Sequence, residues 1–138
     1  MERGSKRSGS VLVLVLILST FIMVVATVSL RSGTLLYELA LDRVAQLKQQ
    51  RTAQALAYYG IAYCKTIGGS KPQSHSLSFD HWPPPNGPYE GEIVIEQTQK
   101  GYTVAATIFK QGHELNSILA EVEEQKGGWR IMDWRSPR

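Results

Sequence analysis

Three side chains that could bind a metal ion lie close together in the middle of the chain: His75, Asp80 and His81. Two imidazoles and a carboxylate are a common ligand set for transition metals. No Glu or third His with a fixed metal-binding spacing stands nearby, so polar loop composition explains the group better. A Ser–His–Asp centre would need its nucleophile on a sharp turn, and the chain has no Gly-x-Ser-x-Gly motif. We therefore expect no catalytic residues, no metal, no cofactor and no enzyme.

The single cysteine limits the sulfur chemistry of the chain. One Cys, Cys64, excludes an intrachain disulfide and a zinc site built from cysteine pairs. Cys64 stands beside Tyr63 in a segment with helical periodicity, where a free Cys is commonly a small buried hydrophobe. An exposed thiol that pairs with a partner is the alternative interpretation, and the sequence leaves both open.

The tryptophans are the remaining candidates for binding. Trp82 precedes three prolines, Pro83–Pro85, and either forms an exposed partner-binding loop or packs under its own prolines. Trp134 is a second candidate partner contact. Because Trp129 and Trp134 are each followed by an arginine, stacking on single-stranded nucleic acid is a further interpretation. Acidic neighbours and a net charge of only +3 argue against nucleic acid as a partner.

The distribution of apolar residues decides the class of protein. A chain of 138 residues allows one domain, and residues 11–30 hold no charge and only four polar side chains. Twenty helical residues span about 30 Å, the thickness of one bilayer core. Outside this block about 108 residues remain, too few for a large two-layer enzyme with a deep cleft. Residues 11–30 therefore fit a membrane-spanning helix.

The flanks of the apolar block set its orientation and leave several interpretations. Arg3, Lys6 and Arg7 precede the block, which places the N-terminus in the cytoplasm by the positive-inside tendency. A secretory signal peptide is one interpretation, although its best small-residue cleavage site, residues 24–26, lies inside the apolar run. A plain single-pass anchor is a second. A buried core helix is a third, opposed by the small size of the remaining chain.

The N-terminus also resembles that of type IV pilins and pseudopilins. A basic leader, residues 1–9, ends in Gly9, small Ser10 follows, and the apolar run begins at once. In that family a prepilin peptidase cuts after such a glycine on the cytoplasmic side of the membrane. The resemblance implies cleavage of the Gly9–Ser10 bond and methylation of the new N-terminus. The bond after Gly4 is a poorer candidate, because cleavage there would leave two basic residues at the mature end.

One position departs from the family pattern. Most members carry Glu as the fifth mature residue, where this chain has Leu14. That Glu is thought to pair with the N-terminal amine of a neighbouring subunit, so its absence suits a tip or initiating subunit. K-type minor pseudopilins of type II secretion systems share the absence, and residues 129–135 also resemble late-competence minor pseudopilins. In such proteins the apolar helix first contacts membrane lipid and then forms the filament core; the corresponding residues here include Val11, Leu12, Leu16, Phe21 and Val25.

The rest of the chain predicts an α+β fold of the pilin type. Residues 10–30 form the membrane half of a long helix, and residues 31–67 form an amphipathic stem that ends before Gly68 and Gly69. Residues 68–88, rich in Pro and Gly, are expected to be a connector. The apolar positions of the stem, spaced mostly by three or four, are Leu35, Leu36, Leu39, Val44, Leu47, Ala55, Tyr58 and Ile61.

Residues 89–138 predict a four-stranded antiparallel meander. Apolar and polar residues alternate over 91–97, 102–110 and 115–123, a fourth strand covers 129–135, and every connecting turn carries Gly. A lone meander exposes its apolar face, so we expect the stem helix to cover it.

The combined prediction is a minor pilin-like structural subunit of the inner membrane, with its C-terminal domain outside the cytoplasm. Its expected partners are the prepilin peptidase, other pilin-like subunits and the inner-membrane assembly platform, in a filament for secretion, adhesion or DNA uptake. The alternative is an unprocessed single-pass protein whose small outer domain binds a partner. The residues are compatible with type IV pilus, type II secretion and competence systems.

Overall fold

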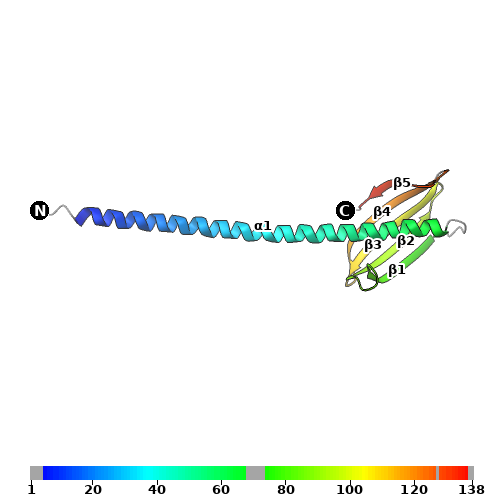
Figure 1. The fold of residues 1–138 in the computed structure, drawn as a ribbon, viewed down its shortest axis with the longest axis horizontal. Coiled ribbons are helices and arrows are strands. Elements are labelled where there is room, and N and C mark those ends of the chain that lie inside the picture. The colour runs from blue at the N-terminus through cyan, green and yellow to red at the C-terminus, as the bar shows by residue number, and fades with distance from the viewer. Residues whose placement is uncertain (1–4, 68–73, 127, 137–138) are drawn as a thin grey trace. The chain divides into compact units, whose positions relative to one another are not determined.

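A computed structural model describes residues 5–67, 74–126 and 128–136 of the chain. The first element is one long helix, α1 (Ser5–Ile67) (Figure 1). The chain divides into two compact units, residues 1–44 and 45–138, with the boundary inside α1.

Helix α1 begins five residues earlier than the sequence predicts. It has no proline, and the glycines inside it, such as Gly9 and Gly33, each cost only about 1 kcal/mol relative to Ala. The helix therefore extends from the apolar run back into the leader. Its last residue is Ile67, as expected; the glycine pair predicted to end it lies outside the described residues.

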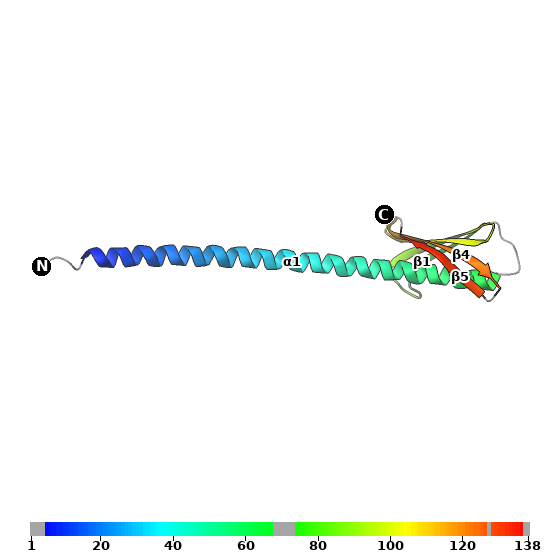
Figure 2. The ribbon, with the colours of Figure 1, turned by 90° about the horizontal axis from the view of Figure 1, so that it is seen from above.

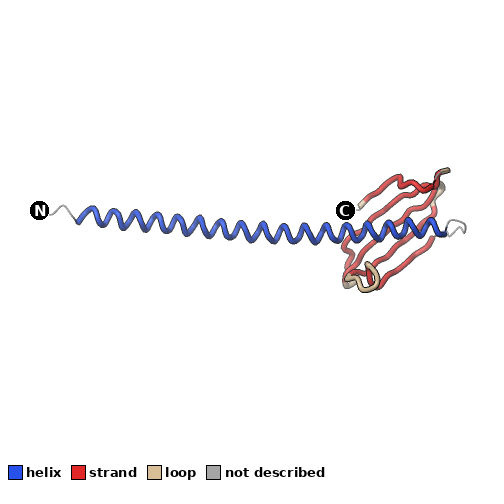
Figure 3. The backbone as a smooth tube through the Cα atoms, viewed as in Figure 1, coloured by secondary structure: helices blue, strands red, loops and turns tan. Residues whose placement is uncertain are grey.

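The remainder of the second unit is an antiparallel sheet of five strands in the order β1-β2-β3-β4-β5 (Figure 3). All four neighbouring pairs are antiparallel, so the sheet is a simple meander. The strands are β1 (Ser74–Trp82), β2 (Tyr89–Gln97), β3 (Gly101–Lys110), β4 (His113–Gln125) and β5 (Gly128–Arg135).

The prediction of four strands was wrong by one, because β1 lies in the segment expected to be a connector. In β1, Ser and Asp residues alternate with His75, Leu77 and Phe79, and the latter three are half-buried. This alternation with a period of two is a strand signal, hidden by a polar composition with no β-branched residue. Pairing with β2 stabilises it: Leu77 lies opposite Ile93.

The predicted alternation in the next three strands is confirmed. In the middle of β2, β3 and β4, every second side chain points to the same face of the sheet and is less than 4% exposed. Lys110 and His113 are joined by the two-residue turn Gln111–Gly112, both with positive φ, which suits a tight hairpin. The buried side chains are Ile93, Ile95, Val104, Ala106, Ile108, Ile118, Ala120 and Val122.

The second unit's part of α1 covers this apolar face, and only one face of the sheet (Figure 2). The predicted stripe was wrong except at Ile61, which is buried as expected. The other seven predicted positions are exposed: Leu35, Leu36, Leu39, Val44, Leu47, Ala55 and Tyr58. Small residues bring the helix backbone close to the sheet, which a bulky Tyr58 would prevent. The residues of α1 that face the sheet are Ala53, Leu56, Ala57, Gly60, Ile61 and Cys64.

Candidate functional site

The predicted processing position lies near the start of α1. Gly9 and Ser10 are both exposed, and no atom of another residue would lie within 4 Å of a Cβ added at Gly9. Leu14, at the fifth position after the predicted cut, is 66% exposed and lies one turn further along the same helix. Nothing in the described part of the first unit covers the bond between Gly9 and Ser10.

The apolar side chains of the first unit point outward all around the helix. The residues expected to contact lipid or form a filament core are between 47% and 71% exposed. Among the described residues, α1 is the one helix that is long and apolar enough to cross a membrane. Those expected contact residues are Val11, Leu12, Leu16, Phe21 and Val25.

The hydroxyl groups inside the apolar segment are compatible with lipid. Ser19 and Thr20 both donate to the carbonyl of Leu16, and Thr27 donates to the carbonyl of Met23 at 2.7 Å. These three hydroxyls are therefore satisfied within the helix, which removes most of the cost of placing them in hydrocarbon.

Exposed apolar side chains also continue beyond the predicted membrane segment. Leu36, Tyr37 and Leu39 are 64–67% exposed, and Val44 is 63% exposed. This stretch also contains Glu38, Asp42 and Arg43. Its mixed composition suits contact with other protein helices better than burial in lipid.

In the second unit, pairs of aromatic rings pack α1 against β1 at one edge of the sheet. Tyr59 packs edge-on against both Phe79 and Trp82, with ring centroids 5.5 and 5.7 Å apart. Tyr63 stacks on His75, and its hydroxyl shares a hydrogen bond of 3.1 Å with His75 Nε2. These contacts explain why a polar strand is held at the edge.

Trp82 is buried, so the interpretation as an exposed partner-binding residue is corrected. Its side chain is 5% exposed, and its indole N–H donates to the carbonyl of Thr52 in α1 at 3.2 Å. The three prolines that follow are exposed in the turn between β1 and β2, and the indole packs against Tyr59 of the helix.

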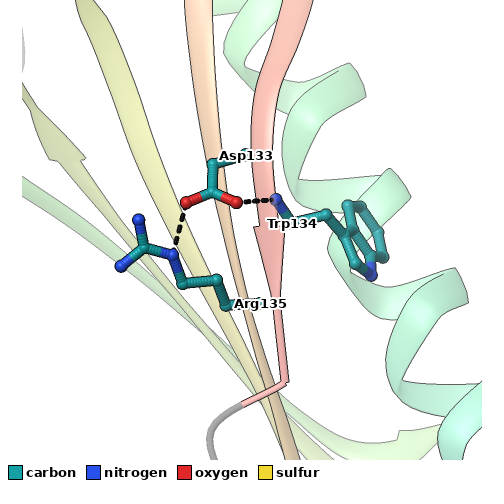
Figure 4. A network of polar contacts seen from close by, with 3 residues as sticks. All are labelled: Asp133, Trp134 and Arg135. Atoms are coloured by element: carbon teal, nitrogen blue, oxygen red, sulfur yellow. Dashed lines mark hydrogen bonds and ion pairs between the residues drawn. The ribbon is translucent and has the colours of Figure 1, made fainter.

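The tryptophans of the last strand also face the helix side. Trp134 is half-buried and stacks on Tyr58, while Trp129 stacks on Tyr102. Figure 4 shows Trp134 directed at α1, and Asp133 accepting bonds from the Trp134 backbone N–H at 2.8 Å and from the Arg135 guanidinium. Both indoles are half-buried, so each keeps only part of its ring surface exposed.

The residues that suggested metal chemistry are not brought together. His75 is engaged with Tyr63, while Asp80 and His81 are exposed on β1. Across residues 5–67, 74–126 and 128–136, no three His, Cys, Asp or Glu side chains form a group that could hold a metal ion.

Cys64 is buried at the seam between helix and sheet, where it is 1% exposed. Burial raises the pKa of its thiol, and a backbone hydrogen bond opposes this in part. The folded protein therefore holds the thiol proton more tightly than the unfolded chain does. It follows that the free energy of unfolding falls as pH rises above the ordinary thiol pKa.

We expect native Cys64 to react with a maleimide at least about tenfold more slowly than an exposed thiol on the same helix, because it is both protonated and covered. The matched control is Cys64→Ala combined with Ala62→Cys, since Ala62 is exposed two residues away. The measurement is the labelling rate by mass spectrometry at neutral pH, followed by labelling in urea. Equal rates in the folded proteins would show that Cys64 is accessible.

No protein-family model, curated protein or solved structure matches this chain.

Proposed function

We propose that this chain is a minor pilin-like (pseudopilin) structural subunit. It is inserted by its apolar helix, cleaved after Gly9 by a prepilin peptidase, and assembled into, or used to prime, a pilus or pseudopilus. It acts through packing contacts alone. The N-terminal half of α1 contacts lipid first and the helices of other subunits afterwards. The positive leader keeps the N-terminus in the cytoplasm, and the sheet unit lies outside it.

The length of exposed apolar surface carries this proposal. In the first unit, exposed apolar side chains run from Val11 to Val44, about 50 Å of helix. A bilayer core accounts for only about 30 Å of that length. The remainder, which contains Glu38, Asp42 and Arg43, suits neighbouring helices that offer both apolar and charged partners. A plain anchor has no need of this extra surface.

The architecture of the second unit supports the same proposal. A helix that crosses one face of an antiparallel meander is the arrangement that the pilin resemblance implies. The observed sheet differs from the expected one only by the added edge strand β1.

The test is the intact mass and N-terminal sequence of the full chain, isolated from membranes with and without a co-expressed prepilin peptidase. We expect the peptidase to remove Met1–Gly9, so that the product begins at Ser10. Gly9→Leu should abolish cleavage, because the peptidases of this family cut after a glycine. Gly4→Leu is the matched control and should be cleaved like the parent.

Two outcomes would contradict the proposal. Retention of residues 1–9 despite an active peptidase would indicate the unprocessed single-pass protein with a partner-binding outer domain. A product that starts near Thr27 would indicate a signal peptide and a secreted domain.

A further inference from the structure

The outer face of the sheet is the face opposite α1. It has short or apolar side chains at its centre and carboxylates around them. Its central cross-strand row pairs Val94 with Ala105 and Ala105 with Leu119, all short or apolar side chains that are half-exposed. Carboxylates alternate with the buried residues on both sides of that row. They are Glu90, Glu92 and Glu96 on β2, Glu121 and Glu123 on β4, and Asp133 on β5.

This outer face belongs to a segment with more acidic than basic side chains. Residues 74–136 contain nine Asp and Glu but only five Lys and Arg. Glu121 lies directly opposite Asp133, and like charges in that position destabilise a sheet. The same face also carries Arg130, opposite Glu123, and Arg135, which forms with Asp133 the one ion pair among the described residues. No Lys or Arg lies opposite the carboxylates of β2, so these carboxylates have unused capacity for a cationic partner.

The same unit carries the complementary surface on the outward side of α1. From residue 45 to 67 the sequence has no acidic residue, and its basic side chains lie on one helical stripe. Two alanines and Tyr58 lie between them, and Tyr58 also packs against Trp134 of the same unit. Successive members are three or four positions apart, so they lie on one face of the helix, and all are exposed. The basic stripe consists of Lys48, Arg51, Ala55, Tyr58, Ala62 and Lys65.

The two surfaces also match in size and shape. The basic stripe is about 26 Å long, and the carboxylates of β2 extend over about 20 Å. Ala55 and Ala62 allow another backbone to approach closely, as Ala53 and Ala57 do on the opposite side of the same helix. An open depression of about 480 Å³, lined by Thr103, Glu121 and Glu123 and also by Lys100, offers space for the end of a basic side chain.

We propose that a second copy of this chain docks here, so that the basic stripe of one copy lies on the outer sheet face of the next. The two surfaces are on opposite sides of one unit, so the contact is heterologous and repeats from copy to copy instead of closing a dimer. Helices and sheets then alternate along the stack. The contact does not depend on cleavage after Gly9.

The experiment places one cysteine on each surface of the full-length chain in membranes that lack a prepilin peptidase. Cys64 is first replaced by Ala; Ala55→Cys then marks the basic stripe, and Ala105→Cys marks the outer sheet face. With a short bismaleimide, the variant that carries both cysteines should give a ladder of cross-linked multimers. Each single-cysteine variant should stay monomeric, and a mixture of the two should stop at dimers. Thr103→Cys replaces Ala105→Cys if the latter does not fold.

Charge reversal separates this contact from chance collision in the membrane. Arg51→Glu should reduce the ladder about tenfold, and Glu121→Lys in the same chain should restore it. Lys126→Glu, in the exposed turn after β4, makes the same change in net charge outside both surfaces and should have no effect. A ladder that survives Arg51→Glu, a dimer formed by Ala55→Cys alone, or no cross-linking at all would each overturn the inference. Because the membranes lack the peptidase, none of these results depends on the proposed cleavage.

Discussion

Trp82→Ala lowers the free energy of unfolding of the helix–sheet unit by about 3–5 kcal/mol, the range expected for a large buried aromatic side chain. Trp82 is 5% exposed, packs against Tyr59 and Phe79, and donates a hydrogen bond to Thr52. Its removal leaves a cavity at the end of β1 and removes a contact between that strand and the helix. The measurement is urea unfolding of the full chain in detergent, followed by circular dichroism.

Two further variants identify the cause of the loss. Trp82→Phe keeps an aromatic ring but loses the indole N–H and part of the buried volume, so it should cost about 1 kcal/mol or more, but less than Trp82→Ala. Trp134→Ala removes an indole that is only half-buried, and we expect it to be clearly less destabilising than Trp82→Ala. If the two alanine variants unfold at the same urea concentration, Trp82 does not hold β1 against the helix.

The second large effect is expected from a larger side chain at Gly60, where α1 contacts the sheet. A Cβ at this position would lie 2.7 Å from Val104 Cγ1 and 2.9 Å from Ile93 Cγ2, and both of those side chains are β-branched and fully buried. They have little freedom to move aside, so Gly60→Leu should destabilise the unit by about 1–3 kcal/mol or more. The same urea titration measures it.

The matched control is Gly33→Leu in the same helix. Gly33 lies in the first unit with no neighbour within 4 Å of the added Cβ, so the substitution should leave unfolding of the helix–sheet unit unchanged. Gly60→Ala should lie between the two, because helix propensity gains about 1 kcal/mol while the clash remains. A Gly60→Leu protein as stable as the control would contradict the close approach of helix and sheet.

Much of the fold follows from local pattern. The apolar run of residues 11–30 is too long and too uniform for anything but a membrane-length helix, and strands β2 to β4 alternate with a period of two. Both patterns depend only on neighbours along the chain, so their residues could be assigned without tertiary contacts. Gly9 and Leu14 were likewise identified from sequence order, and their proposed roles await the cleavage experiment.

Only the tertiary structure decided that β1 is a strand and that Trp82 is buried. The polar Ser74–Asp80 segment forms a strand because β2 pairs with it and because Tyr59 and Tyr63 cover its inward side chains. Trp82 is buried by a helix whose contacting residue, Thr52, precedes it by 30 positions. No local pattern contains such a contact.

The same distinction explains the stem helix. Its sequence determines that residues 31–67 are helical, but Ala55 and Ile61 are both apolar by type. Which of them faces the sheet depends on how closely the backbone can approach, and the small side chains of Ala53, Ala57 and Gly60 decide this by permitting contact with Val104 and Ile93. Hydrophobic periodicity thus determined the long helix and strands β2 to β4, whereas pairing and the fit of side-chain volumes between distant segments decided β1 and which surfaces are buried.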